Sequence, residues 1–168
     1  MRILGVDPGS VTTGFGVVDH EHGRLSLVDQ GCIRTPRGAA LGERLEIIHQ
    51  GLAAVISRTR PVVVAVETPF AGLNIKSLIQ LSHARGVILL AARSASLEIH
   101  EYAPRSVKSA VVGYGGAEKA QVEKMVRLLI PGCASLILSP DAADALAIAI
   151  CHAHTAGSAA RIRVAAGR

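Results

Sequence analysis

Two short apolar segments that each end in an acid constrain the fold of this chain more than any other feature. Residues 2–6 form an aliphatic run that leads into Asp7, and residues 62–66 form a Val-rich run that leads into Glu67. A continuous β-branched run is typical of a strand that is buried on both faces in a parallel arrangement. Strand interiors disfavour acids, and burying an unpaired carboxylate is costly, so both acids require a partner. If the two strands pair, the acids lie at one end of the same sheet.

The segments around these strands predict an α/β fold. A turn signature follows Asp7, and the first three strands are expected to form an antiparallel meander. A helix then precedes the strand at residues 62–66, which implies a strand–helix–strand crossover. The expected strands lie at residues 2–6, 14–18, 25–33, 62–66 and 97–102, and the expected helices at 41–60, at 74–94, from 104, at 117–130 and from 139 to about 154.

The last predicted helix carries two more acids at its start. Ser139 is a good N-cap and Pro140 suits the first helical position, so Asp141 and Asp144 lie near the N-terminus of the helix. Residues three apart share one helix face, although acids at this end also compensate the helix dipole. The pair alone does not separate these two roles. Together with the two strand-end acids, however, four converging carboxylates suit two Mg²⁺ ions, which clamp both oxygens of an in-line displacement at phosphorus.

The composition indicates one domain with an aliphatic core and a basic surface. The chain has 168 residues, of which 49% are hydrophobic, with only two Phe, two Tyr and no Trp. Eighteen Lys and Arg against 13 acids give a formal charge of +5, which fits a nucleic-acid-binding surface or a generic basic protein with dispersed charge. We expect a single domain over residues 1–154 and a flexible basic tail over residues 155–168.

The cysteines and the hydropathy pattern indicate a soluble cytoplasmic protein. Cys32, Cys133 and Cys151 are widely spaced and contain no C-x-x-C pair, which fits reduced thiols in an intracellular protein. The chain shows no signal-peptide pattern and no uncharged run of the roughly 18 residues that a membrane span needs. We therefore expect no membrane partner.

Several motifs, in order along the chain, carry a resemblance to a known family. They are Gly5-Val6-Asp7-Pro8-Gly9-Ser10 with Gly14 and Gly16, Gly31-Cys32-Ile33-Arg34-Thr35, Ala84-Arg85-Gly86, Val107-Lys108, Ala117-Glu118-Lys119 with Gln121-Val122, and the segment from Asp141 to Ala149. In this order the chain resembles the RuvC family of Holliday-junction resolvases, which are crossover junction endodeoxyribonucleases. The match runs from residue 2 to about residue 154.

The resemblance implies a fold, an activity and partners. The implied fold is ribonuclease-H-like, with a mixed five-stranded sheet, an antiparallel meander plus parallel strands, flanked by helices. The implied activity is a Mg²⁺-dependent endonuclease, with two ions per subunit and Mn²⁺ as a substitute, that nicks four-way junction DNA symmetrically during recombination and repair. The implied partners are a second copy of the chain, in a homodimer, and the branch-migration proteins RuvA and RuvB.

The resemblance also implies roles for individual residues. By motif, the metal-binding catalytic acids are Asp7, Glu67, Asp141 and Asp144. Lys108 and Lys119 match family lysines implicated in DNA contact and catalysis, and Phe70 matches an aromatic residue thought to stack on a junction base. Lys76 and Arg85, on the long helix, face either phosphates or solvent, and His83 is a candidate local base. These roles are expectations from the family.

Two features of the region after Glu67 bear on DNA recognition and on assembly. Thr68 and Pro69 depart from the family pattern, and the proline stiffens the loop that carries Phe70, so a cleavage-site preference does not transfer. The helix from residue 74 is the expected dimer interface, because its small residues permit close packing, although they also suit packing within one chain. These small residues are Ser77, Ser82, Ala84 and Gly86.

Three alternatives and one pair of histidines complete the interpretation. The segment at residues 7–16 also resembles the first phosphate loop of sugar kinases and actin-like ATPases, but those proteins need a second domain for which this chain has no room. An RNA-processing nuclease of the same fold and a non-catalytic junction-binding module remain alternatives.

His152 and His154 are two apart on the last helix, and we expect both at its surface.

Overall fold

A computed structural model describes residues 1–69 and 74–166 of the chain, and side chains as far as residue 157. Its strands are β1 (Arg2–Asp7), β2 (Thr12–Glu21), β3 (Arg24–Arg34), β4 (Val63–Glu67) and β5 (Glu98–Tyr102). Its helices are α1 (Leu41–Thr59), α2 (Ile75–Ser94), α3 (Pro104–Val112), α4 (Lys119–Leu129), the 3₁₀ helix η1 (Pro131–Cys133) and α5 (Pro140–Ala166). None of the helices in these ranges is both long and apolar enough to cross a membrane.

The five strands form one mixed sheet in the order β3-β2-β1-β4-β5. Strands β1, β2 and β3 pair antiparallel, as a meander, whereas β4 pairs parallel with both β1 and β5. The mixed five-stranded sheet predicted from the sequence is therefore confirmed. The parallel pairing of β1 and β4 brings the carboxyl ends of both strands to the same edge of the sheet.

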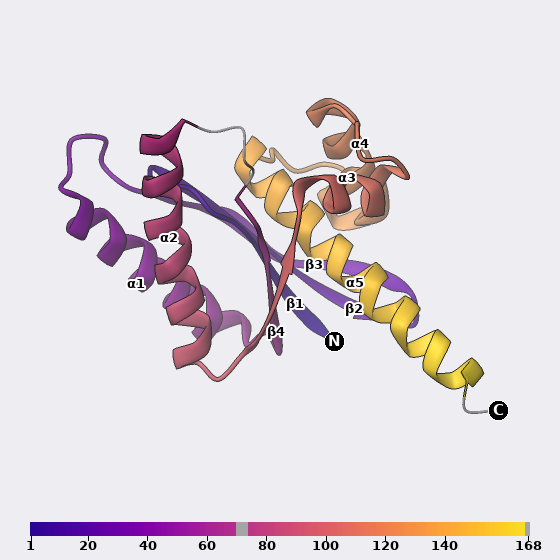
Figure 1. Cartoon of the computed structure of the whole chain (residues 1–168). Coiled ribbons are helices and arrows are strands. Elements are labelled where there is room, and N and C mark those ends of the chain that lie inside the picture. The colour runs from indigo at the N-terminus through magenta and orange to yellow at the C-terminus, as the bar shows by residue number, and fades with distance from the viewer. Residues whose placement is uncertain (70–73, 167–168) are drawn as a thin grey trace.

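Helices cover both faces of this sheet (Figure 1). Helices α1 and α2 pack on one face, where Leu4 and Val64 contribute to a buried cluster. Helix α5 crosses the opposite face with α3 and α4 beside it, and Ile3 and Ala65 contribute to that second cluster. The residues of β1 and β4 therefore alternate between two cores, which explains why the Val-rich segment shows no polar alternation.

Helix α5 approaches the sheet so closely that two strand positions admit only glycine. A Cβ atom added at Gly5 would lie 2.1 Å from the carbonyl oxygen of Ala145, and one added at Gly14 would lie 2.0 Å from that of Asp141. Real Cβ atoms do not approach backbone oxygens to such distances, because van der Waals repulsion forbids it. The glycines of β1 and β2 thus let the N-terminal turns of α5 rest directly on the strands.

Two expectations about α5 are wrong. The helix continues to Ala166, whereas we ended it near residue 154, because the Ala-rich segment that follows has high helix propensity. His152 lies inside the fold, with only 4% of its surface exposed, and its Nδ1 is 2.8 Å from the Tyr102 hydroxyl. Burial lowers the pKa of His152 to about 4, so the neutral imidazole packs against β5. The division of the chain into a domain and a tail stays a prediction.

Candidate active site

The two strand-end acids lie side by side at one edge of the sheet. In the parallel ladder of β1 and β4, Val6 pairs with Val66, and Asp7 and Glu67 are the next residues along their strands. Asp7 is paired on its other side with Gly14 of β2, which has no side chain to shield it. Both carboxylates are half-buried on the face that α5 covers. The parallel pairing inferred from the sequence therefore brings these two acids together.

The acids of α5 reach the same edge because of how the helix begins. Helix α5 starts at Pro140, and the Ser139 hydroxyl accepts a hydrogen bond of 3.3 Å from the Ala142 N–H, which confirms the predicted N-cap. The close approach at Gly14 places Asp141 over β2, beside Asp7. Asp144 follows one turn later. Each of these two helix acids interacts electrostatically with Asp7.

Burial and mutual repulsion make this group of acids hard to ionise. Burial, followed by the charges of Glu67, Asp144 and Asp141, raises the pKa of Asp7 to about 7. Burial and the charge of Asp144 also raise the pKa of Glu67, while Lys119 and Lys108 act in the opposite direction. At neutral pH, Asp7 is therefore half-protonated unless a cation stabilises its charge.

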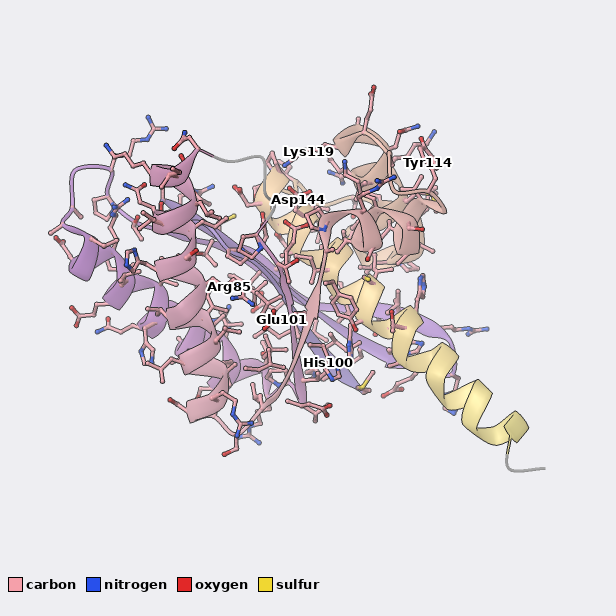
Figure 2. The ribbon with its side chains drawn as sticks, viewed as in Figure 1. Arg85, His100, Glu101, Tyr114, Lys119 and Asp144 are labelled. Carbon is pink, nitrogen blue, oxygen red and sulfur yellow. The ribbon has the colours of Figure 1, made fainter. Side chains whose placement is uncertain are left out.

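Lys119 supplies a positive charge to this site. It is the first residue of α4, and its ammonium donates a hydrogen bond of 2.7 Å to the Asp144 carboxylate (Figure 2). The Asp144 contact, with the nearby charges of Asp7 and Asp141, raises the pKa of Lys119. Lys119 therefore partly neutralises the acids in this structure.

A cavity of about 380 Å³ opens beside the acids. Acidic and basic residues both line it, together with apolar residues of α3, α4 and α5. The lining charged residues are Asp7, Glu67, Asp144, Arg105, Lys108 and Lys119. An open cavity lined by both charges suits an anionic substrate that must approach carboxylates, since the basic residues offset their repulsion.

The acids fit a divalent metal by their chemistry. Carboxylates are the hard oxygen ligands that Mg²⁺ prefers, and a cation would relieve the repulsion that raises the pKa of Asp7. Within residues 1–69 and 74–157, no three Asp, Glu, His or Cys side chains are arranged to hold a metal as they stand. Lys119 holds the Asp144 carboxylate instead. Metal ligation would therefore require these side chains to adjust.

The other predicted DNA-contacting residues lie in different places. Lys108, like Lys119, lines the cavity, whereas Lys76 is exposed in the first turn of α2 and does not line it. Arg85 forms an ion pair with Glu101 of β5, so its charge is partnered within the fold (Figure 2). His83 is exposed on α2 and is not among the lining residues. Phe70 falls outside the described residues, and the role of each of these residues stays a prediction.

Sequence reasoning missed Arg105 as a residue of the cavity. It lies three residues before Lys108 on α3, and both line the cavity. The signal was present, because residues three apart share one face of a helix. A search for basic residues at helical spacing from the family lysine would have found Arg105.

Replacing Gly14 by Ala tests whether the close approach of α5 positions the acids. The added methyl would collide with the backbone of Asp141, so α5 must shift away from β2. Overpacking of this kind costs about 1–3 kcal/mol of folding stability, and we expect cleavage activity to fall more than stability alone explains. Thermal unfolding and cleavage rates of the variant measure both effects. Gly42→Ala is the matched control, because nothing lies within 4 Å of the added Cβ.

Comparisons with known proteins give consistent matches over most of the chain. The family model of crossover junction endodeoxyribonuclease RuvC matches residues 3–152. The RuvC protein of Chloroflexus aurantiacus is 51% identical over 156 residues, which covers 93% of this chain and 94% of the relative. The RuvC protein of Paramagnetospirillum magneticum is 48% identical over 168 residues and covers all of both chains.

A solved structure extends this similarity to the fold. Thermus thermophilus RuvC in complex with a Holliday junction substrate superposes with a TM-score of 0.87 and is 34% identical, covering 93% of this chain and 94% of the other. RuvC proteins have a ribonuclease-H-like fold, which this chain shares. With its mixed sheet and strand-end acids, and with a family model that covers most of its length, this chain belongs to the RuvC family of crossover junction endodeoxyribonucleases.

Proposed function

We propose that this chain is a structure-specific endonuclease that resolves Holliday junctions during homologous recombination and repair. The observation that carries the proposal is the cavity that brings three acids, from two strands and a helix, together with three basic side chains. Family membership supports the class of enzyme, and the junction bound by the Thermus thermophilus relative supports the substrate. Each subunit nicks one of two equivalent strands, so that the cuts are symmetric.

The acids are proposed to hold two Mg²⁺ ions per subunit, with Mn²⁺ as a substitute. Asp7, Glu67, Asp141 and Asp144 are the proposed ligands, because they bring carboxylates from three segments to one edge of the described sheet. Bound there, the metal supplies Lewis-acid stabilisation of the charge that develops at phosphorus. The strands and the helix that carry these acids fix where their backbones lie, which lowers the cost of ordering the reactants once the side chains adjust.

The lysines of the cavity are proposed to bind the phosphates of the substrate strand. Lys108 and Lys119 lie on two helices that approach the acids from one side, and both act electrostatically on Glu67. The ammonium of Lys119, now hydrogen-bonded to Asp144, would be available to a phosphate oxygen if Asp144 ligated a metal. Phe70 is proposed to stack on a junction base, and Lys76 to contact DNA outside the cavity.

We propose a homodimer built on α2. The exposed side of this helix carries a stripe of apolar and small residues at helical spacing. Ile75, Ile79 and Leu90 are 78%, 51% and 59% exposed, and a Cβ added at Gly86 between them would meet nothing within 4 Å. We call these four residues the α2 stripe. An isologous pair of such stripes would bury them and present one active site to each of two strands.

The small residues of α2 differ in exposure, so we assign them different roles. Ser82 is exposed beside the α2 stripe, whereas Ala84 is fully buried in the core against the sheet. Ser82 and Gly86 therefore suit the dimer contact, and Ala84 serves packing within the chain. Contacts with RuvA and RuvB remain part of the proposal on the strength of the family alone.

Mapping the nicks on a four-way junction tests the proposed function. A mobile junction and a linear duplex of the same sequence are each incubated with the protein, in Mg²⁺ and in chelator. We expect paired nicks at symmetric positions, only on the junction and only with metal. Junction binding without nicks in Mg²⁺ would favour the non-catalytic module. Cleavage of structured RNA in preference to the junction would favour an RNA-processing nuclease.

A further inference from the structure

Arg105 is a cation of the cavity that forms no ion pair with a carboxylate in the described part of the chain. Lys119 is hydrogen-bonded to Asp144, and Lys108 acts electrostatically on Glu67. Arg105 lines the same cavity, but no salt bridge within 4.0 Å joins it to any acid in the described part of the chain. Its guanidinium is therefore free to meet an anion that enters the cavity.

The position of Arg105 on its helix is unfavourable for the fold alone. It is the second residue of α3, and the first turn of this helix contains no acid. The N-terminus of a helix carries partial positive charge, so a cation there costs roughly 0.3–1 kcal/mol of local electrostatic energy. A residue that violates a local preference, and that makes no stabilising contact in compensation, is expected mainly at a functional site.

The Arg105 side chain packs closely against Gly115. A Cβ atom added at Gly115 would lie 3.3 Å from the Arg105 Cβ, 3.4 Å from its Nε and 3.1 Å from its carbonyl oxygen. The Arg105 side chain therefore packs along the loop between α3 and α4, against the backbone of Gly115. The same loop is fixed at Tyr114, whose hydroxyl donates a 2.8 Å hydrogen bond to Gln121 of α4. A supported guanidinium loses less conformational entropy on binding.

We propose that Arg105 binds a backbone phosphate of the DNA strand that occupies the cavity, beside the phosphate that is cut. The inference rests on the proposed function and adds a substrate-binding residue to that site. Guanidinium groups present a planar fork of donors that matches two phosphate oxygens, which a lysine cannot reproduce. Arg105 thus fixes the register of the strand, while the lysines face the acids.

Arg105→Gln measures this contact directly. Junction affinity is titrated against salt concentration in chelator, so that no strand is cut. We expect the dissociation constant to rise about three- to tenfold, and the slope of log affinity against log salt to decrease by about one, because one phosphate contact is lost. Arg105→Lys is expected to restore the slope but not the full affinity, because its charge remains without the fork.

Arg24→Gln is the matched control for the loss of charge. Arg24 is exposed at the hairpin between β2 and β3, at the opposite end of the sheet from the acids. The variant removes the same charge from the chain, and we expect its affinity and salt slope to equal those of the wild type. Equal losses in both variants would mean that net charge alone is at work, and would overturn the role of Arg105.

Two glycines of one loop give a second test. Gly115→Ala crowds Arg105, whereas the nearest atom to a Cβ added at Gly116 lies 3.9 Å away and belongs to Tyr114. We expect Gly115→Ala to weaken junction binding about twofold or more and Gly116→Ala to leave it unchanged. In the Arg105→Gln background the effect of Gly115→Ala should disappear, because the two act through one contact.

The outcomes separate the inference from the function on which it rests. Unchanged affinity and slope in Arg105→Gln, with a wild type that binds and cuts the junction, would overturn only the role of Arg105. Reduced affinity with an unchanged slope and a lowered melting temperature would show a structural role and would also overturn it. A wild type that neither binds nor cuts the junction would contradict the proposed function, and the phosphate contact with it.

Discussion

Asp7→Asn is expected to abolish cleavage and to make the metal-free protein more stable. The substitution keeps the size of the side chain but removes a charge from the centre of the acid group. Loss of one preorganised electrostatic contact typically lowers a rate by about a hundredfold or more, and a metal ligand should lie at the upper end. Junction binding is expected to persist, because the basic residues of the cavity are untouched.

The gain in stability follows from the raised pKa of Asp7. Its pKa rises from 3.8 to about 7 on folding, chiefly by burial and then by repulsion from Glu67. Between these values the folded protein binds more protons than the unfolded chain, so its stability falls as the pH rises through about 7. Asn carries no charge and escapes this cost. We expect the free energy of unfolding at pH 8 to rise by roughly 2 kcal/mol, with little change near pH 4.

Unfolding in chelator at pH 4.5, 6 and 8 measures this effect, with Asp19→Asn as the control. Asp19 forms an ion pair with Arg2 at 2.8 Å, and that contact lowers its pKa, so its removal should destabilise the protein slightly at neutral pH. Cleavage by this control is expected to remain. A wild-type cleavage rate in Asp7→Asn would contradict the metal assignment, and a lower stability at pH 8 would contradict the account of its charge.

Ile79→Glu is expected to convert the proposed dimer into monomers. Ile79 is exposed in the second turn of α2, within the α2 stripe. A symmetric contact would bring two introduced carboxylates near one another in an apolar interface, and burying unpaired charge there costs several kcal/mol. The dimer constant should weaken by at least about a hundredfold.

Sedimentation at micromolar concentration measures this change, and nick mapping gives its consequence. Paired nicks on one junction should give way to single nicks, because the two sites are no longer held together. Val62→Glu is the matched control, since Val62 is 58% exposed and precedes β4 at the end of the sheet opposite to the acids. If the Ile79→Glu variant remained dimeric, the proposal that α2 forms the interface would be contradicted.

Much of the fold was predictable because its signals are local. The Val-rich segment of β4 alternates between two buried clusters, and this shows in the sequence as a run without polar residues. The start of α5 was predictable from Ser139 and Pro140, since capping depends on neighbours in the sequence. The end of α5 was not, because the helix continues through Gly157 and Ser158, residues that usually favour a helix end. His152 was misplaced for a similar reason, since its burial depends on Tyr102, 50 residues away.

The sequence by itself determined which residues meet at the edge of the sheet, and the tertiary structure decided what charges they carry and which partners they have. Strand ends and helix starts are local properties, so the four acids could be named from the chain alone. The ion pairs of Lys119 with Asp144 and of Arg85 with Glu101 join different elements. The raised pKa of Asp7 and the packing of Arg105 against Gly115 likewise depend on how the helices pack together and on the sheet. Electrostatic energies depend on distance and burial, and both arise only when the elements pack together.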